Sequence, residues 1–194
     1  MGRLLNYISG LPEGKHITAK ELLHLGNRAA IDQSLSRLAK SGQLLRVSRG
    51  LYVAPVQSRF GARPPSASKT VESLGEQRGE TVVRHGAAAA NALGLTTQVP
   101  VREVYLTSGP SRELKLGAQV VELRHAPSWQ LVLPGSVAGD AVRALSWLGN
   151  KQAEAARQVL EQRLSSSERE ALLATRSLMP TWMAQEISVL AKHG

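Results

Sequence analysis

The chain has 194 residues, which is enough for one well-packed domain or for two smaller ones. Hydrophobic residues make up 42% of it, yet no purely apolar run approaches the roughly 18 residues of a membrane-spanning helix. The chain has no cysteine, which excludes disulfides, a thiol nucleophile and cysteine-ligated metals. Because the first residues also lack the pattern of a signal peptide, we expect a cytoplasmic protein without a membrane partner.

The positive charge is concentrated near the N-terminus. The formal net charge is +9, and residues 1–65 contain ten basic and three acidic residues. Residues 66–194 contain 14 basic and 12 acidic residues, so this larger part is nearly balanced. The asymmetry favours nucleic-acid binding by the N-terminal third.

Three helices are predicted before residue 42. The first ends by Gly10, because Pro12 cannot continue it. Thr18 and Glu21 have the spacing of a capping box and predict a second helix of about two turns. Asn27 is the predicted cap of the third and best-defined helix. The inward face of this third helix is predicted to consist of Ile31, Leu35 and Leu38.

A short basic hairpin follows the third helix. Apolar residues at 44–47 and 51–53 predict two strands around the turn Ser48-Arg49-Gly50. The predicted elements have the order of a winged helix-turn-helix: a helix, a short helix, a Gly-Asn turn, a longer helix and a basic hairpin. The sequence therefore predicts such a domain over residues 1–58, with the third helix in the DNA major groove and the hairpin on the backbone or in the minor groove.

The predicted DNA contacts are polar and basic residues of the third helix and the hairpin. Arginine reads guanine, glutamine reads adenine, and lysine neutralises phosphate. The predicted set is Asn27, Arg28, Gln33, Ser36, Arg37, Lys40, Arg46 and Arg49. Two alternatives stay open: polar residues of an exposed helix that are merely solvated, and a winged-helix adaptor that acts through protein contacts without promoter binding.

The second half is predicted to be a separate domain. Three prolines and no hydrophobic periodicity between residues 54 and 68 predict a linker at residues 59–67. The C-terminal domain, residues 68–194, is predicted to contain a small antiparallel sheet followed by a helical bundle that begins near Val137. The predicted fold class of the chain is therefore α+β.

A second candidate surface lies in this C-terminal domain. Small residues from Gly86 to Ala92 would let another backbone approach closely, and polar residues follow on a loop. The alternative is a small-residue helix that only packs under the sheet. The candidate residues are Arg84, His85, Asn91, Thr96, Thr97 and Gln98.

Two blocks of the chain resemble the AbiEi-type antitoxins of type IV toxin-antitoxin systems. The first is residues 18–55, TAKELLHLGNRAAIDQSLSRLAKSGQLLRVSRGLYVAP, and the second is residues 85–127, HGAAAANALGLTTQVPVREVYLTSGPSRELKLGAQVVELRHAP. The resemblance implies a transcriptional autorepressor that binds an inverted repeat of double-stranded DNA at its own promoter. Because one recognition helix covers too little DNA for a long operator, we expect two copies of the chain, a dimer on the DNA, at such a repeat. It also implies an antitoxin that counters a nucleotidyltransferase-like toxin, with or without direct contact.

The sequence argues against an enzyme. His85 and His125 are the best candidates for metal ligands, but the chain has no HExxH motif, and a lone histidine is more often structural. It also lacks the phosphate-binding glycine motifs and the G-x-S-x-G nucleophile motif. We therefore expect no catalytic residue, metal or cofactor.

Overall fold

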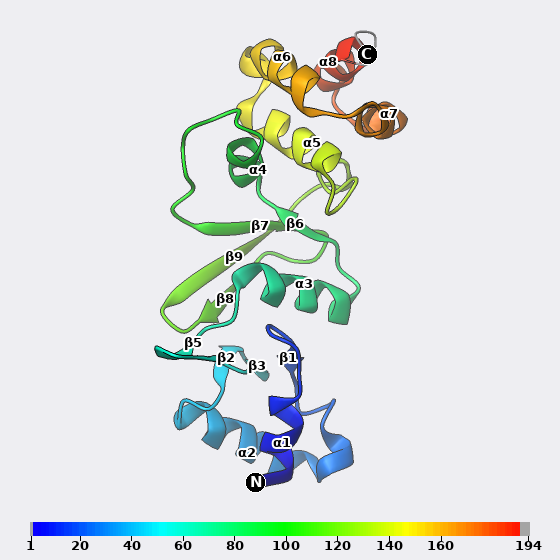
Figure 1. Ribbon diagram of the computed structural model, residues 1–194. Helices are drawn as coiled ribbons and strands as arrows, with labels where there is room; N and C mark the ends of the chain where they lie inside the picture. The colour runs from blue at the N-terminus through cyan, green and yellow to red at the C-terminus, as the bar shows by residue number, and fades with distance from the viewer. Residues whose placement is uncertain (1, 191–194) are drawn as a thin grey trace. The chain divides into compact units, whose positions relative to one another are not determined.

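The computed structural model describes residues 2–190 of the chain (Figure 1). The fold is mixed α+β, as the sequence predicts, with eight α-helices and small sheets within the described residues. The chain forms two compact units, here called unit 1 and unit 2. Unit 1 comprises Met1–Glu80 and Arg112–Glu122, and unit 2 comprises Thr81–Ser111 and Leu123–Gly194.

The first part of unit 1 alternates helical segments with short strands. Its elements are α1 (Gly2–Ser9), β1 (His16–Ile17), the 3-10 turn η1 (Leu23–Leu25), α2 (Arg28–Lys40), β2 (Leu45–Ser48) and β3 (Leu51–Val53). The three strands form an antiparallel sheet in the order β1-β3-β2. The long separation in sequence between β1 and β3 means that α2 and η1 lie in the connection between paired strands.

One apolar cluster holds these elements together. The inward face of α2 packs with residues of α1, of the β1 strand and of the segment around β2 and β3. The burial of this stripe is the main favourable term for a helix of 13 residues, which would be marginal in isolation. The most deeply buried members are Ile17, Leu22, Leu35, Leu38 and Leu44.

The predicted second helix is wrong in length and type. The capping contacts do form, since the Thr18 backbone N–H and its hydroxyl both donate to the Glu21 carboxylate, at 3.0 and 2.9 Å. The chain then makes turns and only one 3-10 turn, Leu23–Leu25, before Gly26. A cap satisfies the first N–H groups, but too few residues follow before Gly26 for an α-helix to propagate.

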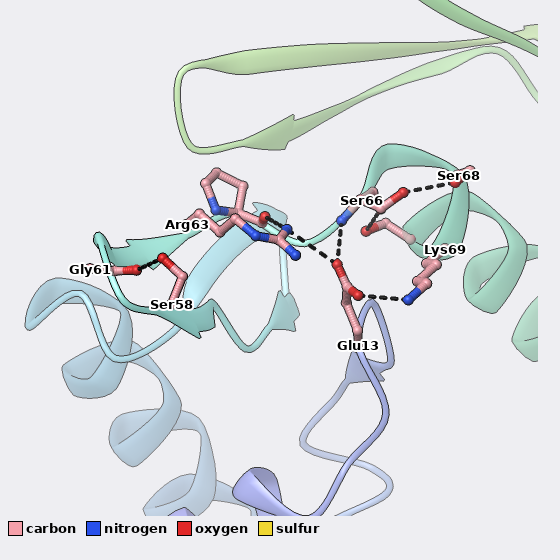
Figure 2. A network of polar contacts seen from close by, with 9 residues as sticks. Glu13, Ser58, Gly61, Arg63, Ser66, Ser68 and Lys69 are labelled. Carbon is pink, nitrogen blue, oxygen red and sulfur yellow. Dashed lines mark hydrogen bonds and ion pairs between the residues drawn. The ribbon is translucent and has the colours of Figure 1, made fainter.

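The predicted linker at residues 59–67 contains secondary structure. Strands β4 (Val56–Ser58) and β5 (Gly61–Arg63) pair as an antiparallel hairpin, and helix α3 (Ala67–Arg78) begins directly afterwards. Figure 2 shows the Glu13 carboxylate reaching this segment: it accepts from the Ser66 N–H at 3.0 Å and from the Lys69 ammonium at 2.7 Å. Long-range contacts therefore order a stretch that has no periodicity of its own.

The compact units do not divide at residues 59–67. Helix α3, predicted to open the C-terminal domain, belongs to unit 1, where it packs against β1. The His16 backbone N–H donates to the Ser73 hydroxyl at 3.3 Å, and Gly14 passes so close to Lys69 that an added Cβ would lie 2.8 Å from the Lys69 carbonyl carbon. At φ +80° and with this contact, position 14 favours glycine.

A four-stranded sheet contains the remaining strands. They are β6 (Val82–Arg84), β7 (Glu103–Thr107), β8 (Arg112–Leu116) and β9 (Gln119–His125), in the order β6-β7-β9-β8. These strands agree with the small sheet predicted from the sequence. Strand β8 and the first part of β9 belong to unit 1, where β8 lies against β2.

Unit 2 is dominated by helices. They are α4 (Gly86–Ala92), α5 (Val137–Leu148), α6 (Ala153–Arg163), α7 (Ser166–Thr175) and α8 (Thr181–Leu190), with 3-10 turns at Ser128–Gln130, Asn150–Gln152 and Arg176–Leu178. Their apolar faces share one core, which confirms the predicted helices after residue 137. Helix α4 lies directly on α5: a Cβ added to Gly86 would stand 2.4 Å from the Arg143 carbonyl oxygen. The small residues of α4 therefore serve close helix packing.

Candidate nucleic-acid interface

The outward face of α2 is positioned by its cap and its buried stripe. The Asn27 side chain accepts from the Ala30 N–H at 2.9 Å, which fixes the start of the helix. With the apolar stripe inward, Gln33, Arg37 and Lys40 are exposed and Ser36 is half-buried. Positions 33, 37 and 40 are three and four residues apart and share one face of the helix. This face presents an amide and two cations.

Two of the predicted contact residues have structural partners. The side-chain oxygen of Asn27 is occupied by the helix cap. The Arg28 guanidinium donates to the Asp32 carboxylate at 2.9 Å, with both side chains more than half exposed. An exposed pair of this kind contributes little to stability, so Arg28 can exchange Asp32 for a phosphate at small cost.

The β2–β3 hairpin carries the other predicted cations. Its turn has two residues, Arg49 and Gly50, between the paired Ser48 and Leu51. Gly50 has φ +72°, a conformation that L side chains rarely adopt, so the turn favours glycine at this position. Arg49 is exposed at the tip, and Arg46 is exposed along β2. The hairpin therefore presents two arginines on a short, tightly closed support.

A short hydrogen-bonded turn joins the α2 face to the hairpin within unit 1. Only the segment 41–44 separates them, and the N–H groups of Gln43 and Leu44 both donate to the Leu38 carbonyl, at 2.9 and 3.1 Å. These bonds tie the end of α2 to the start of β2. The structure thus connects Arg37 and Lys40 to Arg46 and Arg49 through a short, hydrogen-bonded turn.

The second candidate surface lies in unit 2, and its residues also have structural roles. The His85 side chain caps α4 by accepting from the Ala87 N–H at 3.2 Å. Arg84 pairs at 3.6 Å with the Asp140 carboxylate, which also accepts from the buried Arg143 guanidinium at 2.9 Å. These contacts leave both side chains less free than the sequence alone implied.

The loop after α4 is held by Asn91. The Asn91 amide donates to the carbonyls of Thr96 and Gln98 at 3.4 and 3.1 Å, and the Gln98 N–H donates to the Thr96 hydroxyl at 3.2 Å. The structure therefore brings Asn91, Thr96 and Gln98 together, with Thr97 exposed between them. Their hydrogen bonds serve the shape of the loop, and Val99 and Val101 beyond it are 75% and 100% exposed.

The two histidines that the sequence offers as metal ligands, His85 and His125, have structural partners. Within residues 2–190 no three His, Asp or Glu side chains gather as ligands. The His125 ring hydrogen bonds with the Gly109 carbonyl at 3.0 Å, and His85 is the cap of α4. Nor is any helix in the described range long and apolar enough to cross a membrane.

One exposed group was missed by the sequence analysis. Arg59 and Phe60 form the two-residue turn of the β4–β5 hairpin, and the Arg59 guanidinium lies 4.7 Å from the Phe60 ring centroid. Phe60 is 86% exposed. The prolines and the lack of periodicity predict a linker here, and Arg59-Phe60 is not one of the glycine-containing pairs that indicate a two-residue hairpin turn in a sequence.

Comparison with known proteins identifies the family. The architecture is that of a mixed α+β protein whose N-terminal unit presents a basic helix and hairpin. Over residues 3–172 the chain matches a family described as "Family of unknown function (DUF6088)", and it belongs to that family. No curated protein and no solved structure matches the chain.

Proposed function

We propose that the N-terminal part of unit 1 is a winged helix-turn-helix domain that binds double-stranded DNA. The observation that carries this proposal is the exposed Gln33, Arg37 and Lys40 face of α2, joined by a short turn to a hairpin with exposed Arg46 and Arg49. The order α1-β1-η1-α2-β2-β3 and the sheet order β1-β3-β2 are compatible with this fold.

Each part then has a role on DNA. Helix α2 enters the major groove, where Gln33 and Arg37 contact base edges. Lys40 and the hairpin arginines contact phosphates, which position the protein without reading sequence. A helix of 13 residues is about 20 Å long, and its width suits the major groove.

We further propose that the protein is a transcriptional autorepressor and the antitoxin of a type IV toxin-antitoxin system. This part is supported by the resemblance of residues 18–55 and 85–127 to the AbiEi-type antitoxins. Its DNA target is an inverted repeat in its own promoter, bound by two copies of the chain. Its functional partner is a nucleotidyltransferase-like toxin, whose toxicity it counters through unit 2.

Promoter binding tests the DNA proposal. The full chain is titrated against a fluorescently labelled duplex from upstream of its own reading frame, and against a scrambled duplex of equal length and composition. We expect tighter retention of the promoter duplex, a salt-dependent affinity, and a footprint with two-fold symmetry. Equal or absent binding to both duplexes would refute the repressor assignment and favour an adaptor that acts through protein contacts.

The antitoxin role has its own test. The neighbouring reading frame is expressed alone and together with this chain, and growth is measured. We expect growth arrest that this chain relieves. A variant of this chain with alanine at Asn91, Thr96, Thr97 and Gln98 is expected to bind the promoter normally but to relieve the growth arrest no longer. Circular dichroism shows whether this variant is folded, and full rescue by the folded variant would remove the loop from the functional site.

A further inference from the structure

The β4–β5 hairpin presents an arginine and an aromatic ring at a hydrogen-bonded tip. Strands Val56–Ser58 and Gly61–Arg63 pair in register, so that Ser58 faces Gly61 and Arg59-Phe60 form the turn. The Ser58 hydroxyl donates to the Gly61 carbonyl at 2.7 Å and accepts from the Phe60 N–H at 3.2 Å. These bonds close the tip from inside, as Figure 2 shows for Ser58 and Gly61.

The exposure of Phe60 is unusual for its residue type. It is the single phenylalanine of the chain, and 86% of its surface faces solvent. Aromatic side chains are favoured in cores and interfaces because burial of their rings is strongly favourable. The contact with Arg59 covers little of the ring, so the tip keeps both a guanidinium and an apolar wedge available to a partner.

The base of the hairpin is anchored to the rest of unit 1. The Arg63 guanidinium pairs with the Glu13 carboxylate at 3.3 Å and donates to the Pro64 carbonyl at 3.0 Å. Hydrogen bonds from the Lys69 ammonium and the Ser66 N–H lower the pKa of Glu13 to about 2, so the carboxylate is ionised at neutral pH. A tip held in this way loses little conformational entropy when it binds.

The positive charge of the hairpin indicates the kind of partner that it can bind. Residues 56–63 include two arginines and no acidic residue. The hairpin begins only two residues after β3, the strand that pairs with the basic β2 strand. A positively charged arm attached to a positively charged surface is complementary to a polyanion. Minor-groove proteins combine the same two groups, an arginine in the groove and an apolar wedge between base pairs.

We propose that the β4–β5 hairpin is a second DNA-contacting arm, in which Phe60 inserts between base pairs from the minor groove and Arg59 contacts the adjacent groove or phosphates. This inference rests on the proposed DNA-binding function and extends it. Insertion partly unstacks one base step and kinks the duplex, so the arm makes DNA bending part of recognition.

The test measures affinity and bending together. The probe is a duplex of about 30 base pairs that contains the footprinted promoter site, with a donor and an acceptor dye at its ends. Phe60→Ala is expected to weaken binding about tenfold and to lengthen the end-to-end distance toward that of free DNA. Phe60→Leu keeps an apolar wedge and is expected to retain most of the bend. Arg59→Ala is expected to lower the slope of log affinity against log salt by about one.

A matched control comes from the same unit. Val120, in β9, is also an exposed apolar residue, at 48%, and Val120→Ala is expected to leave affinity and bend unchanged. Since Phe60 has almost no buried surface, Phe60→Ala is expected to melt at the temperature of the unmodified protein.

The outcomes separate the two proposals. Failure of the unmodified protein to bind the promoter duplex overturns the proposed function, and this inference with it. Normal promoter binding with unchanged affinity and bend in Phe60→Ala overturns the second arm alone. Weaker binding with an unchanged bend overturns insertion as the mode of contact.

Discussion

At the scale of single residues, two kinds of polar side chain can be distinguished in the candidate interface. Gln33, Arg37 and Lys40 project from a helix that other residues hold in place. Asn27, in contrast, has its side-chain oxygen engaged by the Ala30 N–H. A substitution of Asn27 therefore tests the helix cap before it tests DNA contact, whereas a substitution of Gln33, Arg37 or Lys40 tests DNA contact directly.

Base-reading and phosphate-binding residues are expected to differ in their effects. Arg37→Ala and Gln33→Ala should each cost about 1–3 kcal/mol on the preferred site and relax base preference, because a base-edge contact discriminates by about that much. Titration of promoter and scrambled duplexes checks this prediction. Unchanged preference in both variants would contradict the assignment of α2 to the major groove.

Lys40→Ala and Arg49→Ala should weaken binding to both duplexes alike. In each variant, the slope of log affinity against log salt concentration should fall by about one, because one phosphate contact fewer releases about one counterion fewer from the DNA. Affinities measured at several salt concentrations provide the check. A loss confined to the promoter duplex would mean that these residues read bases instead of phosphates.

His16 is expected to make stability depend on pH. Burial, and to a smaller extent the nearby Arg78 guanidinium, lowers the pKa of His16 to about 4, so the ring is neutral in the folded protein at pH 7. The unfolded chain binds this proton near pH 6.5, so stability is full above that pH and falls as pH drops from about 6.5 to 4. The contribution is of the order of 3 kcal/mol at most, at about 1.4 kcal/mol for each unit of pKa.

Thermal unfolding at pH 7 and pH 4.5 measures this effect. His16→Gln cannot take up a proton and is expected to flatten the dependence, even if its own stability is lower. His24→Gln, at an exposed position, is the control. An unchanged pH dependence in His16→Gln would show that other groups cause it. Glu13 adds to the dependence at pH 4.5, where the unfolded carboxylate, with its ordinary pKa of 4.5, is half protonated. The unmodified protein and His16→Gln both contain Glu13, so the difference between them isolates the contribution of His16.

At the scale of elements, the hairpin β4–β5 and the start of α3 depend on one distant carboxylate. Glu13 contacts Arg63, Ser66 and Lys69, which lie 50 or more positions further along the chain. The prolines and charges of residues 54–68 do not predict these contacts with Glu13. The order of this segment is consequently a property of the pairing between two parts of unit 1.

Glu13→Ala is expected to loosen this segment. Loss of the acceptor should increase hydrogen exchange at the Ser66 amide and at its neighbours up to Lys69, because the Ser66 N–H loses its partner. Glu72→Ala, an exposed position on α3, is the matched control. Exchange in the Glu13 variant equal to that of the unmodified protein would show that packing alone orders the segment.

At the scale of the whole molecule, a cut near residue 66 does not separate the two compact units. It divides unit 1, and leaves α3 and the β8–β9 hairpin residues on the other fragment. A fragment of residues 1–65 also lacks Ser73, the partner of His16. The domain division predicted at residues 59–67 therefore differs from the division by contacts.

The fragment of residues 1–65 is expected to be less stable than the same residues in the full chain. It should melt at a lower temperature and less cooperatively, because the α3 side of its core is exposed. Circular dichroism and limited proteolysis of the fragment and the full chain compare the two. A fragment as stable and cooperative as the full protein would show that α3 contributes nothing to this unit.

The sequence by itself was sufficient for features that depend on neighbouring residues. The period of Ile31, Leu35 and Leu38, the Asn27 cap and the turn Ser48-Arg49-Gly50 predicted α2 and its hairpin. The apolar stripes after Val137 predicted helices α5 to α8. Helix periodicity, caps and two-residue turns involve contacts within about four positions. A local pattern therefore contains most of the information that specifies them.

Only the tertiary structure decided what depends on distant partners. It placed α3 in unit 1, ordered β4–β5 through Glu13, and left Phe60 exposed at a hairpin tip. Each outcome depends on residues many positions away that compete for, or fail to cover, the same surface. Long-range packing can override the local preference of a segment for helix or strand. The sequence pattern of a short segment therefore does not specify that packing.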